Sequence, residues 1–231
     1  EPDAMPRHLI APLCTLALIA LFPLSGATFY VELTTKIMIM AIFALSLDLL
    51  VGWTGLVSFG HAAFFGVGAY ALALLSPKAA AAGLWSSLGI AIVAAALCAL
   101  VVGIFVLRTR GIYFIMVTLA FAQMFYFVFH DTDFGGGSDG RYVNLKPDAS
   151  ILGFTPFDLD KPNQIYYVVL AVLVLVFAFL QMVLRSPFGR ALQGIKANEQ
   201  RMRALGYPVT AYKLAAFTLA GALAGLAGYL L

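Results

Sequence analysis

The sequence is short of charge. Only 11% of its 231 residues are Asp, Glu, Lys or Arg, whereas 62% are hydrophobic. A soluble globular domain carries about 25% charged residues. This scarcity excludes a water-soluble enzyme with an isolated core, a disordered chain and a nucleic-acid-binding domain with a basic face. It predicts a chain that lies within a lipid bilayer.

The residues and motifs that catalysis and cofactor binding need are also scarce. The two cysteines, Cys14 and Cys98, both stand in apolar runs, so we expect neither a disulfide framework nor a metal cluster. The three histidines lie far apart with no Cys or Glu at ligand spacing. Ser58 and His61 do not belong to a Gly-x-Ser-x-Gly turn, and no Gly-x-x-x-x-Gly-Lys loop is present to bind ATP. We therefore expect no catalytic residue and no cofactor in this chain.

Long apolar runs account for most of the sequence. A spanning helix needs about 20 predominantly apolar residues to cross about 30 Å of hydrocarbon. Seven runs meet this need, and Asp48 is the only formal charge within them. They are Leu9–Gly26, Ile37–Val57, Ser58–Leu75, Leu84–Leu107, Gly111–Phe129, Ile165–Leu184 and Leu214–Leu231. The predicted fold is all-α: one transmembrane domain over residues 1–231, a polytopic bundle of about seven spans.

The first run admits a second interpretation, a signal peptide over 9–27 with Arg7 as its basic flank, although Pro12 and Pro23 interrupt it. The chain starts at Glu1 rather than Met and ends inside or just past an apolar run. We therefore expect it to be a fragment of a protein with further spans.

Basic residues set the predicted orientation, because cytoplasmic loops of membrane proteins are enriched in Lys and Arg. Nine basic residues fall on one side of the predicted spans: Arg7, Arg108, Arg110, Arg185, Arg190, Lys196, Arg201, Arg203 and Lys213. Five fall on the other, together with six aspartates of the long segment 130–164. The N-terminus and segment 185–213 are thus predicted to be cytoplasmic, segment 130–164 external, and 214–231 the last span.

The second and third runs are contiguous, and their 39 residues are too many for one span and right for two. Only two short stretches could form the turn between them: residues 52–55, which include Trp53, and residues 58–61. Non-helical backbone inside a bilayer must be covered by protein or line a wet cavity. We therefore predict an in-membrane turn and treat its polar residues, Trp53, Ser58 and His61, as candidates for a translocation path.

Two more polar residues within spans are path candidates. A carboxylate in mid-span costs about 2.5–3.5 kcal/mol on insertion scales, so Asp48 is expected to face the bundle interior with a partner. Alternatively it is structural, bonded to the broken backbone or to another subunit. Gln123 either lines a path or bonds across helices. His61, at the start of a helix, is either a packing residue or lies where helix N–H groups suit a solute carboxylate.

Glycines 66, 68, 221, 225 and 228 indicate close helix packing.

The segment 186–208 is predicted to be helical. It opens with Ser186 and Pro187, a helix-start pattern, and closes with Gly206 and Pro208. One apolar stripe runs along it, as a single helix or a close helix pair, and basic residues occupy the other face. The stripe consists of Phe188, Leu192, Ile195, Met202 and Leu205. Such a helix either lies on the membrane surface or inserts into a soluble partner.

Three ordered motifs resemble one family. The stretch 44–70 (ALSLDLLVGWTGLVSFGHAAFFGVGAY), the stretch 110–124 followed by a Gly-Gly-Ser-Asp-Gly loop, and the stretch 186–208 are similar to LivM-type permease subunits of branched-chain amino acid importers of the ATP-binding-cassette (ABC) class. The resemblance runs from about residue 37 to the end. Permeases of that family usually continue with several more spans, so it also implies an incomplete member.

The resemblance implies a bacterial inner-membrane subunit that works by alternating access. Its implied partners are a LivH-like permease, two cytoplasmic ATPase subunits that hold ATP and Mg, and a periplasmic solute-binding protein. The segment 186–208 becomes the coupling segment, with candidate residues Gly189, Arg190, Glu199, Arg203 and Gly206. A urea or short-amide importer shares these motifs and stays open as an alternative. A less favoured hypothesis is an ion-coupled carrier that uses Asp48 as its ion site.

Overall fold

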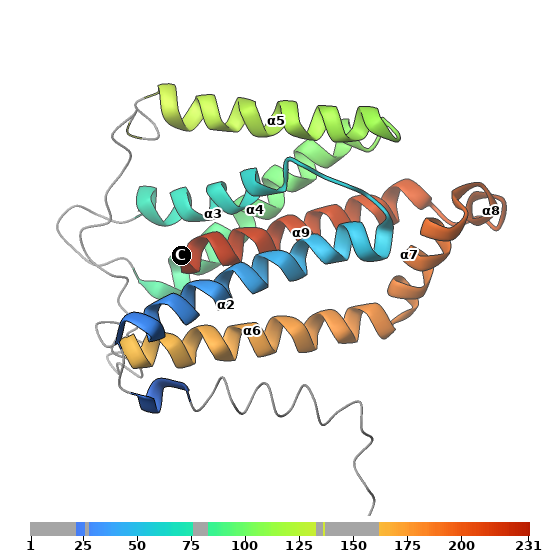
Figure 1. The fold of residues 1–231 in the computed structure, drawn as a ribbon. Helices are drawn as coiled ribbons and strands as arrows, with labels where there is room; N and C mark the ends of the chain where they lie inside the picture. Colours follow the sequence, from blue (N-terminus) through green and yellow to red (C-terminus); the bar gives the residue numbers. More distant parts are fainter. Residues whose placement is uncertain (1–21, 26–27, 76–82, 133–135, 137–161) are drawn as a thin grey trace, which may run out of the picture.

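The structure, a computed structural model, describes residues 22–25, 28–75, 83–132, 136 and 162–231. The described residues form helices joined by short connections (Figure 1). In chain order these are the 3₁₀ turn η1 (Phe22–Ser25), α2 (Thr28–Asp48) with its π-helical continuation η2 (Leu49–Thr54), α3 (His61–Leu75), α4 (Leu84–Val106), α5 (Ile112–Asp131), α6 (Pro162–Arg185), α7 (Pro187–Ala197), α8 (Glu199–Ala204) and α9 (Val209–Leu230).

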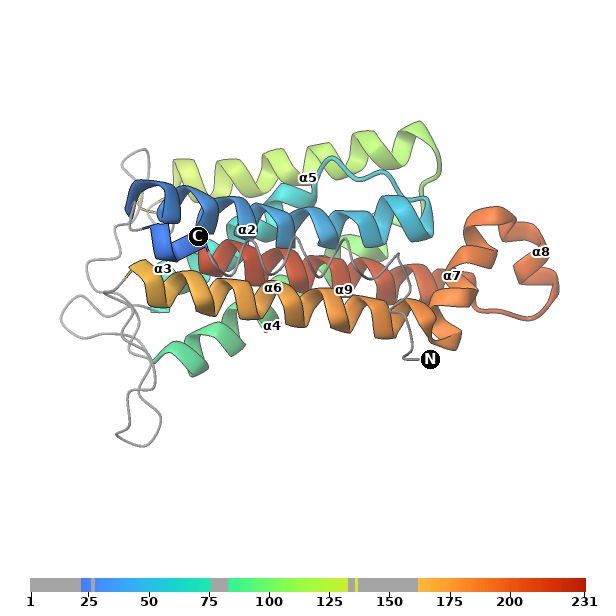
Figure 2. The ribbon, with the colours of Figure 1, turned by 60° about the horizontal axis from the view of Figure 1, so that its bottom comes forward.

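The helix α9 lies at the centre of the bundle. It packs against α2, α3 and α4, while α6 packs on the other side of α2 and α5 lies at the edge beside α3 and α4 (Figures 1 and 2). The short helices α7 and α8 extend beyond one end of the bundle, which we call the α8 end (Figure 2). The fold is therefore a bundle with one central helix and one short helical extension.

Small residues allow α9 to lie this close to its neighbours. A Cβ atom at Gly221 or Gly225 would overlap the Cβ of Ala99 or Ala95 on α4. One at Gly228 would overlap the backbone carbonyl oxygen of Phe65 on α3. Close backbone approach is the usual way in which helices associate in lipid, where there is no hydrophobic drive to bring them together. The prediction of close packing is confirmed for these glycines and for Gly68, but Gly66 has open space where its Cβ would be.

Among the described residues, five helices are long and apolar enough to span a membrane: Thr28–Thr54, Leu84–Val106, Ile112–Asp131, Asn163–Arg185 and Val209–Leu230. The predicted spans at 84–107 and 111–129 agree with α4 and α5 to within two residues. Three helices begin earlier than predicted: α6 by three residues, at Pro162, and α2 and α9 by five or more, at Thr28 and Val209. The N-terminal parts of α2 and α9 hold charged residues, Lys36 and Lys213, so the apolar runs in the sequence did not include them. These parts are nevertheless helical, because long charged side chains near a helix end can reach water.

The count of seven spans is not reproduced by the described residues. The run Ser58–Leu75 forms only the 15-residue helix α3, too short to cross a bilayer alone. Of the run Leu9–Gly26, only Phe22–Ser25 is described, as a 3₁₀ turn. The rest of that run, and with it the choice between a span and a signal peptide, lies outside the described residues. So does nearly all of segment 130–164.

Candidate functional site

The first feature of the site is a break between α2 and α3. After η2 the chain is non-helical from Gly55 to Gly60 and runs back along the bundle, so that α3 starts partway along it (Figure 1). Gly55 has a left-handed φ of 73° and its N–H bonds to the carbonyl of Leu50, which ends η2. The predicted tight turn within the membrane is thus corrected. The chain reverses at the α8 end, and the non-helical backbone follows the reversal.

The helix α5 covers this non-helical segment. The backbone N–H of Phe59 donates to Thr118 Oγ1 at 3.2 Å, and Thr118 Oγ1 donates to the carbonyl of Ile115 at 2.8 Å. A Cβ at Gly60 would overlap the carbonyl oxygen of Thr118, so only glycine allows this approach. Protein therefore shields Ser58 and Gly60 in the second half of the segment, whereas Gly55, Val57 and Phe59 are exposed.

His61 joins α3 to α2. It is 2% exposed, and its Nε2 lies 2.9 Å from Ser46 Oγ on α2. Because Ser46 Oγ donates its own proton to the carbonyl of Phe43 at 2.6 Å, the His61 Nε2–H is the donor in this pair. The ring packs against Phe43 and Phe64. Its Nδ1 is buried and has no hydrogen-bond partner among the described residues. His61 is thus a packing residue with one polar atom left unpaired.

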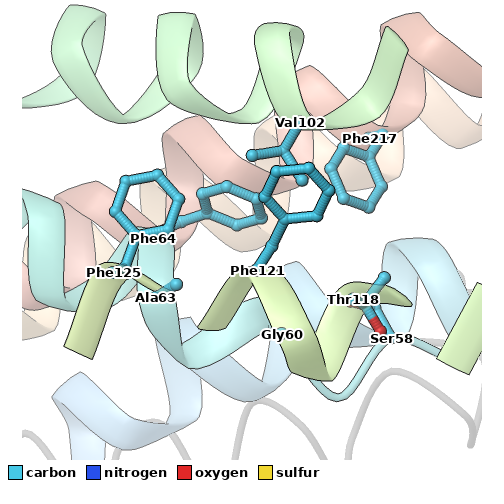
Figure 3. A pocket seen from close by; sticks show the side chains of 9 residues that line it. All are labelled: Ser58, Gly60, Ala63, Phe64, Val102, Thr118, Phe121, Phe125 and Phe217. Atoms are coloured by element: carbon cyan, nitrogen blue, oxygen red, sulfur yellow. The ribbon is translucent and has the colours of Figure 1, made fainter. Parts of the chain in front are cut away.

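A narrow apolar crevice lies beside the start of α3 (Figure 3). Its lining comes from the segment 55–60 and from α3, α4, α5 and α9: Ser58, Gly60, Ala63, Phe64, Val102, Thr118, Phe121, Phe125 and Phe217. The crevice is too narrow for a water molecule. Ser58 is 5% exposed, and its Oγ has no partner among the described residues. A buried, unpaired hydroxyl is destabilising unless something else uses it.

The other predicted path residues lie away from this crevice. Asp48, the last residue of α2, is exposed and its side chain forms no hydrogen bond or ion pair with the described part of the chain; its carboxylate lies over Gly52, one turn on. The prediction that it faces the bundle interior is wrong for these residues. Gln123 is exposed on α5, and Trp53 is half-buried on η2. Helical periodicity shows which residues share a face, but α2 and α5 are apolar all round, so it could not show which face packs.

The α8 end holds an open cleft of about 370 Å³. It lies between residues 54–57, the α4–α5 turn, the α7–α8 junction and Lys213 on α9. Its floor is apolar, with Leu56, Phe114 and Ile195, and its rim carries Arg110, Lys196, Glu199 and Lys213. The cleft and the crevice follow each other along the same non-helical segment and the same face of α5.

Glu199 is the centre of a charge cluster on the rim. Its carboxylate accepts from Lys213 Nζ on α9 at 2.7 Å and from Arg203 on α8 at 2.5 Å, and lies 3.7 Å from Arg110 before α5. Partial burial raises the pKa of the Glu199 carboxyl, but the hydrogen bond and charge of Lys213 and the charges of Arg203 and Arg110 outweigh it and hold that pKa below its ordinary value. Glu199 is thus an internal tie, whereas Arg190 is exposed without an ion pair among the described residues.

The helix pair α7–α8 forms much as predicted. Ser186 is the N-cap of α7 with Pro187 at its first turn, although the Ser186 hydroxyl donates to the carbonyl of Val183 instead of capping. Asn198 separates the helices and caps α8 by accepting from the N–H of Arg201 at 2.9 Å. Gly206 ends α8 with a φ of 86°. Bonds from Gly206 N–H to the carbonyl of Arg203 and from Tyr207 N–H to that of Met202 form a Schellman cap.

Contacts of α7 bind it to the bundle. Gly189 lies against the backbone of Leu184, where a Cβ would overlap the carbonyl oxygen. Leu192 and Ile195 are buried, as their place in the apolar stripe predicted, but Leu205 at the end of that stripe is 65% exposed. Lys196 Nζ donates to the carbonyl of Gly52 on η2 at 2.5 Å. This bond links the helix pair to the element just before the break.

Sequence reasoning missed several of these residues. Thr118 holds α5 against the non-helical segment because its backbone lies in contact with Gly60, a residue 58 positions away in the sequence. Its one sequence signal is that it is a small polar residue inside an apolar, aromatic span. The pairing of Glu199 with Arg203 follows from their i,i+4 spacing. The approach of Arg110 and Lys213 does not, because it depends on how α4, α5 and α9 are arranged.

Taken together, apolar helices of spanning length, a break partly covered by α5 and a helix pair beyond one end define a multi-pass membrane protein. Residues 29–231 match the family model described as "Branched-chain amino acid transport system / permease component". The chain therefore belongs to this family of ABC-transporter permeases and is of the LivM type.

Two curated relatives support the assignment. The chain is 33% identical over 219 residues to the high-affinity branched-chain amino acid transport system permease protein LivM of Salmonella typhimurium, and 34% identical to that of Escherichia coli K12. Each alignment covers 87% of this chain and 51% of the relative. The chain thus spans about half the length of the curated relatives it matches. No solved structure matches it.

Proposed function

We propose that this chain is part of the permease subunit of an ABC importer for branched-chain amino acids in a bacterial inner membrane. Family membership and the relatives' names support the substrate class. Its partners are a LivH-like permease, two cytoplasmic ATPase subunits that bind ATP and Mg, and a periplasmic binding protein. The α8 end and the N-terminus are cytoplasmic, consistent with Arg110, Arg190, Lys196, Arg203 and Lys213 at that end.

The observation that carries the mechanism is the bond from Lys196 on α7 to the carbonyl of Gly52 on η2. Through it, movement of α7 and α8 is transmitted to η2 and from there to the non-helical segment 55–60. The cluster around Glu199 ties the same helix pair to α9 and to the start of α5. ATP-driven closure of the ATPases on α7–α8 would therefore displace the elements on both sides of the cleft, as alternating access requires.

Removing the hydrogen bond from Lys196 to Gly52 tests the coupling between the helix pair and the non-helical segment. In the complete transporter, Lys196→Met is expected to lower leucine uptake per ATP hydrolysed while assembly is unchanged. Arg108→Met is the matched control, because Arg108 is an exposed basic residue at the same end whose side chain forms no hydrogen bond or ion pair with the described residues. Charge reversal at Arg203 is expected to uncouple hydrolysis from uptake in the same way. Normal coupling in both variants would place α7–α8 on the membrane surface instead.

The class of transporter is tested by labelled leucine uptake in cells that express the full-length chain with its partner subunits. Uptake that survives collapse of ion gradients, stops on ATP depletion and is competed by isoleucine but not urea supports the proposal. Competition by urea alone would keep the mechanism and change the substrate. Loss of uptake on gradient collapse, with ATP maintained, would indicate the ion-coupled carrier. Asp48 is exposed, lies outside the crevice and has no ion pair with the described residues, which gives that alternative no support.

A further inference from the structure

We propose that the crevice at the start of α3 is a subsite for the transported amino acid, in which α3 and Ser58 hold the carboxylate and the phenylalanines receive the apolar side chain. The proposal rests on the proposed function and specifies where in this chain the substrate is bound. It follows from unpaired polar groups, the crevice lining and the weak packing of one wall.

One donor left unpaired by the described residues, the Ser58 hydroxyl, lies at the edge of the crevice next to the start of α3. Ser58 lines the crevice and is only 5% exposed, yet its hydroxyl has no partner in the described structure. The helix α3 begins three residues later, at His61, and its first turn supplies Ala63 and Phe64 to the lining. The N–H of Ala63 bonds to the carbonyl of Gly60, whereas those of His61 and Ala62 have no acceptor among the residues described. His61 and Ala62 do not themselves line the crevice, but the unpaired Ser58 hydroxyl beside the positive end of α3 suits a carboxylate.

The remainder of the crevice suits an apolar side chain. Four phenylalanines and a valine form the wall: Phe64, Val102, Phe121, Phe125 and Phe217 (Figure 3). No charged residue of the described chain lines it. A small carboxylate ligand with a branched aliphatic group would therefore satisfy both parts of the crevice, while a neutral, fully polar solute such as urea would leave the aromatic part without a matching contact.

One wall of the crevice is able to move. Thr118, Phe121 and Phe125 all belong to α5, which buries only two residues, Phe114 and Thr118, against the described chain. The hydrogen bond from Phe59 N–H to Thr118 Oγ1 holds α5 against the break. If α5 moves outward, this bond breaks, and Thr118 Oγ1 regains a lone pair that can accept from the substrate ammonium group. The closed crevice is thus the state without substrate, and displacement of α5 opens it.

Ser58→Ala tests the carboxylate contact in the complete, reconstituted transporter. A hydrogen bond to a charged group is worth about tenfold or more in a binding equilibrium. We therefore expect the leucine transported per ATP to fall by about tenfold. The thermal midpoint of the complex should not fall, because the substitution removes a buried hydroxyl that has no partner. The matched control is Ser87→Ala, whose hydroxyl is paired with Tyr229 at 2.6 Å outside the crevice; its transport ratio should be unchanged.

A cysteine-labelling measurement tests the crevice independently of transport. A Ser58→Cys variant, in a background where Cys14 and Cys98 are replaced, is treated with a small thiol reagent. Labelling is expected to rise during ATP-driven turnover, when α5 moves, and to fall when leucine is present in excess on both sides of the vesicle. Urea should not protect.

The outcomes separate this inference from the proposed function. If the unmodified complex shows ATP-driven leucine uptake but Ser58→Ala behaves like Ser87→Ala and leucine does not protect the Ser58→Cys variant from labelling, the subsite is refuted and the importer stands. If the unmodified complex transports no branched-chain amino acid, both fail. A reduced transport ratio at unchanged stability, with protection by leucine, supports the subsite.

Discussion

The helices α5 and α9 are nearly equal in length and both apolar enough to span a membrane, yet they are packed very differently. Eleven residues of α9 are buried, many of them glycine or alanine, whereas α5 buries only Phe114 and Thr118. The exposed face of α5 carries large side chains, including Tyr113, Met124 and Phe127. In a bilayer, apolar character places a helix among lipids but does not choose its neighbours. Small residues do, because they let two backbones approach.

This difference assigns the two helices different mechanical roles. α9 is the fixed centre to which α2, α3 and α4 are packed. α5 is held by a few specific contacts: the hydrogen bond of Thr118 to the break, the ion pair of Arg110 with Glu199, and ring contacts of Phe114, Phe121 and Phe129 with α9, α4 and α3. A helix held in this way can move without disrupting the core, which suits the wall of a path that must open.

Gly228→Val on α9 is expected to give the largest effect. The new side chain would overlap the carbonyl oxygen of Phe65, which is backbone and cannot rotate away. Overpacking of this kind costs about 3 kcal/mol or more, so we expect little folded protein. The yield of monodisperse protein in detergent and its thermal midpoint measure this. Ala120→Val on the exposed side of α5 makes the matched control and should change stability by less than about 0.5 kcal/mol. Equal losses of stability in Gly228→Val and Ala120→Val would contradict the difference in packing between α9 and α5.

Glu199→Gln tests the tie that links α8 to both helices. The loss of its charged hydrogen bonds is expected to cost about 1.5 kcal/mol in thermal or chemical unfolding. Arg201→Gln, on the same short helix and without an ion pair among the described residues, is the control. A cost equal to that of the control would mean that the cluster does not hold α8.

Lowering the pH of the unmodified protein should reproduce the loss of stability expected for Glu199→Gln. The folded pKa of Glu199 lies below its unfolded value, so the unfolded state binds more protons as the pH falls. The stabilisation is therefore complete above about pH 4.3, the ordinary glutamate value, and disappears as the pH falls through the lowered pKa. The stability difference between Glu199→Gln and the unmodified protein should shrink in that acidic window and stay constant near neutral pH.

Thr118→Val is expected to have the smallest effect on stability, about 1 kcal/mol, because it removes the single hydrogen bond that α5 provides to Phe59. Hydrogen exchange at the Phe59 amide should accelerate, while exchange in α9 stays slow. Thr34→Val on α2, which removes only a hydrogen bond to Tyr30 within the same helix, is the control. If exchange at Phe59 is unchanged, α5 is held by something other than Thr118.

Much of the fold could be read from the sequence, and the parts that could not share one cause. Apolar length located α4 and α5 to within two residues, and the Ser186–Pro187 and Gly206 patterns located the ends of the α7–α8 pair. The sequence also indicated that the α2–α3 boundary is non-helical. The positions of Asp48 and Gln123 could not be deduced, because helices that are apolar on every side give no sign of which face packs.

What the sequence by itself determined is the membrane location, the main helices, the helical segment at one end and the family. These depend on local properties: apolar length, glycine and proline positions, and motif spacing. Only the tertiary structure decided that the chain reverses at the α8 end and that Glu199 pairs with Lys213 and Arg110. It also decided that Ser58 is buried beside a crevice of phenylalanines, without a hydrogen-bond partner in the part of the chain that is described. The reason is physical. In lipid the hydrophobic effect does not pair helices, so their arrangement depends on close fits and polar contacts between residues far apart in the chain.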